Sequence, residues 1–135
     1  MVTFREAVEA RDLDAIEAML ADGVVFRSPI VFKPYAGKAY TSAFLRAVLE
    51  VFEGFHYVRE IGDANGLDHV LVFEATVEGL TLTGCDVLQY DAEGKITDFM
   101  VLVRPLRATQ GFQRQMAAKI DQIEAQAEAA MKAGR

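Results

Sequence analysis

The chain has 135 residues, of which 52% are hydrophobic, and its formal net charge is −6 at pH 7. This length and apolar fraction predict one folded domain with a substantial core and argue against a disordered chain. The scattered basic residues give no support to nucleic-acid binding, and no apolar run approaches the roughly 20 residues that a membrane-spanning helix needs.

The first residues and the cysteine count bear on the cellular compartment. The N-terminal residues do not combine a charged segment with a following apolar one, so no secretion signal is predicted. The one cysteine, Cys85, cannot form a disulfide within the chain, which is compatible with a reducing compartment. We therefore expect a cytoplasmic protein.

The first half of the sequence predicts helices around one short strand. Thr3 and Glu6 have the spacing of a capping box, and Asp12 is a candidate N-cap for a second helix. Apolar spacing and turn residues predict a helix to about residue 10, a helix over 13–20, a strand over 24–28, a loop over 30–37 and a helix over 38–52.

The second half of the sequence predicts a run of strands. These strands are expected over 55–62, 68–78, 80–90 and 96–104. Asn65-Gly66 and Glu78-Gly79 are tight-turn dipeptides, so neighbouring strands should form antiparallel hairpins. A run of helices followed by a run of strands indicates an α+β fold.

The C-terminal segment differs in composition from the rest. From Arg107 it is rich in Ala, Gln, Glu and Lys, and one helix is predicted to about Lys132. We therefore divide the chain into a domain over 1–106 and a C-terminal helical extension over 107–135.

Two predicted strands are apolar on both faces. These runs lie at 69–73 and 99–103, and one face of each should meet the helices. The other face most simply meets a second subunit, so we expect a homodimer.

The strand over 80–90 carries the first candidate for chemistry. Successive strand residues point to opposite faces, so Asp86 shares a face with Leu82, Leu88 and other mostly apolar residues. A buried carboxylate is costly unless it is paired or takes up a proton. Asp86 is therefore either a tuned acid in a pocket or a structural hydrogen-bonding group.

Three segments together resemble the nuclear-transport-factor-2-like superfamily, within it the SnoaL-like and ketosteroid-isomerase-like branch. They are 10–26, the stretch from Ser28-Pro29 to 35–37, and 84–96. The resemblance implies a cone-shaped curved antiparallel sheet wrapped around helices, also called cystatin-like. This fold hosts isomerases, cyclases, hydrolases, dehydratases and non-enzymatic binders, so it does not by itself assign a function.

The resemblance also allows site residues to be compared by position. The isomerases have a general-base carboxylate where this chain has Ser28, and a phenolic hydroxyl where it has Phe4. Their protonated aspartate, late in the sheet, matches Asp86. A serine cannot take a proton from carbon without a base beside it, so steroid isomerisation by that mechanism is not expected. SnoaL-like cyclases resemble this arrangement, with an aspartate late in the sheet as acid/base.

Other candidates have both a functional and a structural interpretation. His56 could exchange protons with Asp86, or it could be an ordinary strand residue. Tyr35 could donate a hydrogen bond to a ligand at the cavity mouth, or it could anchor its loop. Ser28, Phe4 and Leu88 complete the expected ligand pocket.

No metal is predicted, since the two histidines, His56 and His69, do not form a ligand motif. No organic cofactor is predicted either, and the sequence has no phosphate-binding glycine loop. The expected ligand is a small, mostly apolar molecule that carries oxygen. Isomerase, cyclase or dehydratase chemistry with Asp86 as acid/base is one hypothesis. The alternative is a non-catalytic ligand-binding domain or a dimeric structural domain, and the sequence leaves the choice open.

Overall fold

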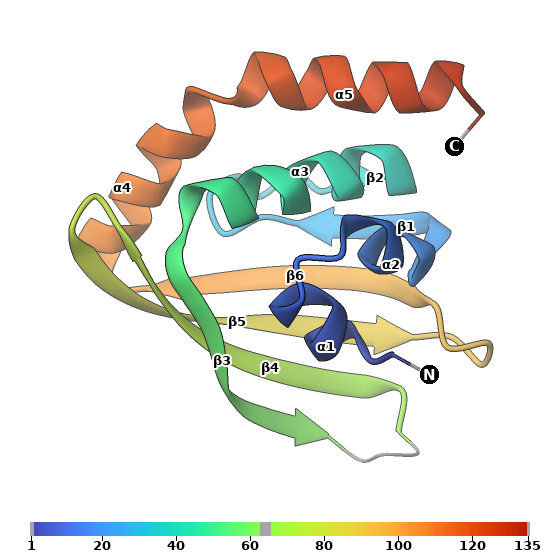
Figure 1. The fold of residues 1–135 in the computed structure, drawn as a ribbon, viewed down its shortest axis with the longest axis horizontal. Coiled ribbons are helices and arrows are strands. Elements are labelled where there is room, and N and C mark those ends of the chain that lie inside the picture. Colours follow the sequence, from blue (N-terminus) through green and yellow to red (C-terminus); the bar gives the residue numbers. More distant parts are fainter. Residues whose placement is uncertain (1, 63–65, 135) are drawn as a thin grey trace.

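The computed structural model describes residues 2–62 and 66–134, which form one sheet with helices on one side of it (Figure 1). In chain order the elements are α1 (Phe4–Glu9), α2 (Leu13–Ala18), β1 (Leu20–Arg27), β2 (Tyr35–Ala36), α3 (Lys38–Val51), β3 (Glu53–Gly62), β4 (Asp68–Val77), β5 (Leu80–Tyr90), β6 (Ile96–Arg104), α4 (Leu106–Ala117) and α5 (Ile120–Lys132). The expected α+β class is confirmed.

The strands are ordered β2-β1-β6-β5-β4-β3 in a single curved sheet. The predicted antiparallel meander is confirmed for β3 to β6. The resemblance implied an antiparallel sheet, and β1 departs from this pattern because it pairs in parallel with β6, so the sheet as a whole is mixed. A parallel pair needs a long connection, and here α3 and the other three meander strands supply it.

The N-terminal helices begin as their capping residues predict. The Thr3 hydroxyl accepts from the Glu6 amide and the Glu6 carboxylate accepts from the Thr3 amide, which completes the capping box. Asp12 caps α2, but this helix ends at Ala18, before the predicted residue 20. Leu20 already belongs to β1, where it is buried and pairs with Ile96.

The predicted turn between β4 and β5 is present. Glu78 and Gly79 both have positive φ angles, 50° and 75°, which is the geometry of a tight hairpin turn that matches the sheet twist. The other predicted turn, Asn65-Gly66, falls partly outside the described residues because Asn65 is not among them.

The expected single C-terminal helix is wrong, because the chain turns at Ala118 and Lys119 between α4 and α5. The turn places both helices against the body of the protein. On α4, Phe112 stacks on Phe52 with ring centroids 4.8 Å apart, whereas α5 runs back over α3 and buries Ile123 and Ala127 (Figure 1). A straight helix could not bring both apolar faces to the same core.

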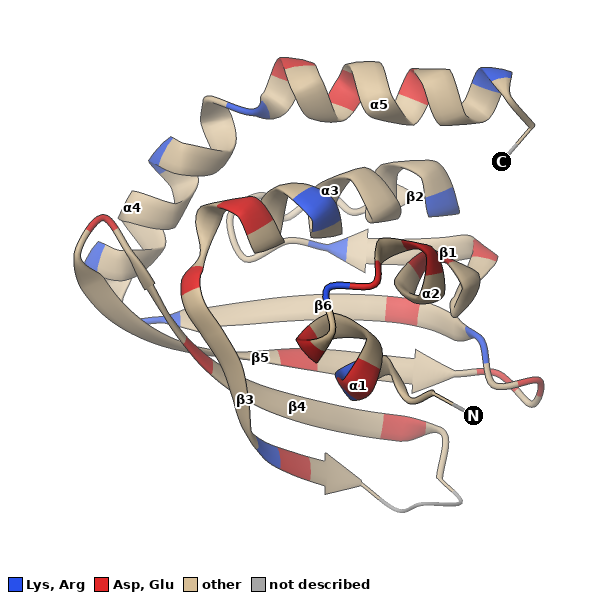
Figure 2. Cartoon of the chain, viewed as in Figure 1, with Lys and Arg blue, Asp and Glu red and all other residues tan. Residues whose placement is uncertain are grey.

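Charge is spread over the surface rather than gathered into a basic stripe (Figure 2). Within the described residues, no helix is both long and apolar enough to cross a membrane. The outer face of the sheet carries half-buried or exposed apolar side chains, among them Val72, Cys85 and Leu102. This face is where the predicted second subunit would bind.

Candidate functional site

Asp86 points from β5 into the helix-covered side of the sheet. The burial pattern of β5 alternates, and Leu82, Gly84, Asp86 and Leu88 are all on the buried face. Asp86 is 5% exposed, and it is the one buried acidic or basic side chain among the described residues. The alternation predicted from the sequence therefore gives the observed orientation of this carboxyl group.

An apolar cavity adjoins Asp86. Side chains from the first three helices and four strands line it, including Phe4, Val8, Leu49, Tyr57 and Phe73. Its volume is about 30 Å³, which is enough for a water molecule. A larger ligand therefore requires the surrounding side chains to move outward.

Tyr57 is the hydrogen-bonding partner of Asp86. Its hydroxyl on β3 donates to Oδ2 of Asp86 over 2.8 Å, and both side chains are buried. Burial raises the pKa of the Asp86 carboxyl from 3.8 to about 7, and the hydrogen bond from Tyr57 opposes this rise. Near neutral pH, Asp86 is therefore present both as a carboxylic acid and as a carboxylate.

The protonation state of Tyr57 does not change near neutral pH. Burial, and next the nearby charge of Asp86, raise the pKa of the Tyr57 phenol well above its usual value. The phenol remains a neutral hydrogen-bond donor, while Asp86 gains and loses the proton. The pair thus combines one group that titrates near pH 7 with one fixed donor.

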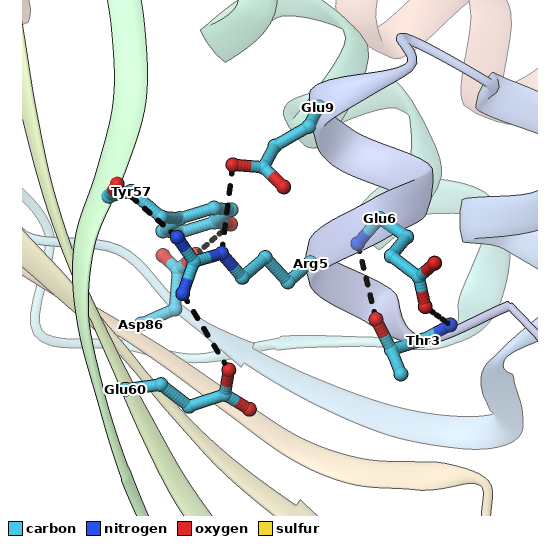
Figure 3. Close-up of polar contacts among 7 residues, drawn as sticks. All are labelled: Thr3, Arg5, Glu6, Glu9, Tyr57, Glu60 and Asp86. Atoms are coloured by element: carbon cyan, nitrogen blue, oxygen red, sulfur yellow. Dashed lines mark hydrogen bonds and ion pairs between the residues drawn. The ribbon is translucent and has the colours of Figure 1, made fainter.

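Arg5 ties α1 to β3 beside this pair (Figure 3). Its guanidinium group donates to the backbone carbonyl of Tyr57 at 3.5 Å and lies 3.6 Å from the Glu60 carboxylate. The Glu9 carboxylate, one helical turn along α1, also pairs with Arg5 at 3.5 Å. These contacts hold the helix that supplies Phe4 and Val8 to the cavity.

The structure does not bring His56 to Asp86. His56 lies on the outer side of β3, where its Nδ1 is 2.8 Å from the Gly54 carbonyl oxygen and its Nε2 is 3.5 Å from a Glu74 oxygen. Neighbouring strand residues face opposite sides, so the inward position belongs to Tyr57. The hypothesis of a His56–Asp86 proton transfer therefore has no support in this geometry.

Sequence reasoning missed Tyr57 as a functional residue. A signal was available, since Phe55 and Tyr57 are two residues apart on β3 and therefore share one face of the strand. Both side chains line the cavity. Arg59, the next residue in that alternation, is exposed, and the pairing of β3 with β4 shifts between Tyr57 and Arg59. This irregularity hides the periodicity that would have identified the inner face.

The other predicted pocket residues divide between two places. Phe4 lines the Asp86 cavity. Ser28 and Tyr35 instead line a second apolar groove of about 260 Å³ between the β1–β2 segment and the C-terminal helices. Leu88 is fully buried in the core and lines neither space.

Two aromatic rings mark the boundary between the cavity and this groove. Phe26 lines the groove and Phe99 lines the cavity, with ring centroids 5.8 Å apart. The Ser28 hydroxyl accepts hydrogen bonds from the Ile30 and Val31 amides, which fixes the loop after β1. Tyr35 packs on Phe44 with centroids 4.6 Å apart, consistent with the structural interpretation of this residue.

Burial raises the pKa of the half-buried Cys85 thiol, which disfavours the reactive thiolate. Within the described residues, no three His, Cys, Asp or Glu side chains are grouped so that they could hold a metal ion.

Comparison with known proteins finds solved structures with the same fold. A steroid delta-isomerase from Pseudomonas aeruginosa is 39% identical over 88% of this chain and 87% of its own, with a TM-score of 0.82. An uncharacterised protein with a cystatin-like fold from Silicibacter pomeroyi DSS-3 is 31% identical over 93% and 90% of the two chains, with a TM-score of 0.84.

A SnoaL-like protein of unknown function from Burkholderia thailandensis E264 shares the fold at 18% identity, over 76% of this chain and 89% of its own, with a TM-score of 0.60. No curated protein matches the chain. The family model for the SnoaL-like domain matches residues 2–99. The chain therefore belongs to the SnoaL-like domain family, within the NTF2-like fold.

Proposed function

We propose that this protein catalyses proton transfer on a small, mostly apolar carbonyl compound, without a metal or organic cofactor. The observation that carries the proposal is the Tyr57–Asp86 pair, in which a buried carboxyl with a pKa of about 7 adjoins an apolar cavity. A group that titrates near the working pH can both accept and donate a proton efficiently.

The proposed reaction is an isomerisation with two proton transfers. The Asp86 carboxylate takes a proton from the carbon next to the ligand carbonyl, and the electron pair of that C–H bond moves onto the carbonyl oxygen as an enolate. Protonation of Asp86 weakens the hydrogen bond that it accepts from Tyr57, so the Tyr57 hydroxyl can donate instead to the negatively charged enolate oxygen. Asp86 returns its proton to another carbon of the ligand, so no co-reactant is consumed.

This assignment gives Asp86 the part that a base at the Ser28 position has in the ketosteroid isomerases. Ser28 lies in the separate groove and its hydroxyl accepts hydrogen bonds from loop amides, so Ser28 has no part in the proposed reaction. The likeness to a protein named as a steroid delta-isomerase supports the reaction class. It does not identify the ligand, and a cavity of about 30 Å³ favours a molecule smaller than a steroid.

A second candidate function is ligand binding without turnover. The apolar groove of about 260 Å³ that contains Tyr35 supports it, because this space is larger than the Asp86 cavity and holds no acidic or basic side chain. In this case, Asp86 would serve only to fix β3 against β5 through Tyr57.

The two functions are separated by a small β,γ-unsaturated ketone, cyclohex-3-en-1-one. Catalysis converts it to the conjugated enone, which is followed by ultraviolet absorbance. In D₂O, the hydrogens next to the carbonyl are replaced by deuterium whenever the proton on Asp86 exchanges with solvent before it is returned. We expect the rate to increase with pH through about 7, as Asp86 ionises, and to be lost in Asp86→Asn. The proposal fails if wild type and Asp86→Asn give the same isomerisation and the same exchange.

A further inference from the structure

We infer that the ligand of this protein carries an anionic group, a carboxylate or a phosphate, at the end opposite the carbon that reacts. This inference rests on the proposed function and specifies its substrate class. It is drawn from a surface hollow of about 380 Å³ between the α1–α2 connection and α3, which is lined by Arg11, Leu13, Arg46, Leu49 and Glu50.

The hollow is next to the Asp86 cavity. Leu49 lines both spaces, and this side chain is only half-buried. A shift of the Leu49 side chain would therefore join the hollow to the cavity. Such a path would allow the apolar part of a ligand to reach Asp86 while its other end remains at the surface.

Two guanidinium groups face this hollow with spare hydrogen-bonding capacity. Arg46 makes no hydrogen bond or ion pair with any residue that the structure describes. Arg11 makes one hydrogen bond, from Nη1 to the Leu49 carbonyl oxygen at 3.3 Å, which leaves most of its five N–H donors free. Arg46 and Leu49 are three residues apart on α3 and so lie on the same side of that helix.

The acidic residue of the hollow is already compensated. Lys119 is 3.0 Å from one carboxylate oxygen of Glu50, and the Gln122 amide donates to the other at 3.4 Å. Glu50 therefore pairs with Lys119 and Gln122 rather than with Arg11 or Arg46.

The backbone does not explain why an arginine stands between α1 and α2. Arg11 has a φ of 56°, in the left-handed region that favours glycine or asparagine after a helix. An arginine fork binds carboxylate and phosphate oxygens in pairs. Two such forks beside an apolar passage fit a ligand with an apolar body and one anionic end.

The inference is tested with three probes that share an apolar chain, namely octanoate, octyl phosphate and the neutral octanamide. Binding at pH 7 is followed by two-dimensional NMR of the ¹⁵N-labelled protein, which gives both affinity and location. We expect one or both anions to bind about tenfold more tightly than the amide, with shifts at Arg11, Arg46 and Leu49. The ranking of octanoate against octyl phosphate decides which anion the hollow prefers.

The matched variants remove charge while keeping a polar side chain. In the double variant Arg11→Gln, Arg46→Gln, the preference for the anions should disappear and octanamide should bind as before. Arg107→Gln, an exposed position on α4 outside the hollow, should keep the preference.

Equal binding of the three probes to wild type would overturn the inference, as would loss of the preference in Arg107→Gln. Shifts confined to the groove around Tyr35, or no binding of any probe, would also overturn it. Failure of the proposed function has a different signature, since it appears as unchanged isomerisation in Asp86→Asn.

Discussion

Replacing Asp86 by asparagine should change how stability depends on pH. In the folded protein the pKa of this carboxyl is about 7, whereas its ordinary value is 3.8. Between these two pH values the folded protein holds the proton that the unfolded chain has lost. The free energy of unfolding therefore falls as pH rises through this window, by about 1.4 kcal/mol per pH unit, and the total loss is about 4 kcal/mol.

Asp86→Asn removes this pH-dependent fall in the free energy of unfolding, because asparagine does not ionise. Its amide oxygen can still accept the hydrogen bond from Tyr57, so the fold should be kept. At pH 4 the variant and wild type should have similar stability, and at pH 8 the variant should be more stable by up to about 4 kcal/mol. Urea unfolding at intervals of one pH unit measures the difference directly.

A control variant separates this effect from the general influence of charge. Asp98→Asn removes a carboxylate that pairs with Arg27 at the surface, and it should keep the wild-type slope between pH 4 and 7. A difference between Asp86→Asn and wild type that stays constant from pH 4 to 8 would refute the buried, titrating carboxyl.

Three further outcomes are expected. Tyr57→Phe removes the hydrogen bond that lowers the Asp86 pKa, so this pKa should rise above about 7 by about one to two pH units in an NMR titration; an unchanged or lower value would contradict the pair. Gly84→Ala should destabilise the protein by about 1–3 kcal/mol in urea, because its Cβ would lie 2.6 Å from the Leu102 carbonyl oxygen and against the Phe73 ring; wild-type stability would show that the sheet adapts freely. Sedimentation at micromolar concentration should give a dimer for wild type and a monomer for Leu102→Asp, which places a charge on the outer sheet face; a wild-type monomer would contradict the predicted homodimer.

The elements with a local signal were predictable from the sequence. The capping box at Thr3, the turn at Glu78-Gly79 and the alternation around Asp86 each depend on residues only a few positions apart. These signals determine the helix start, the hairpin and the buried orientation of the carboxyl. The predicted family follows from the same local patterns, and the match over residues 2–99 confirms it.

The features that depend on distant contacts were not predictable in this way. No turn signal in the sequence marks the parallel pairing of β1 with β6. The break between α4 and α5 at Lys119 is explained only by the packing of both C-terminal helices on the rest of the protein. The division of the expected pocket has the same origin. The rings of Phe26 and Phe99 meet from two strands, with the groove that contains Ser28 on one side and the Asp86 cavity on the other.

The protonation of Asp86 is the property on which the proposed chemistry depends most directly. The measurement is an NMR titration of its carboxyl carbon in the wild-type protein between pH 3 and 9. A midpoint near pH 7 is expected from the burial of Asp86 beside Tyr57. A midpoint near the ordinary value of 3.8 would mean that Asp86 is a permanent carboxylate at neutral pH, and it would remove the acid/base role.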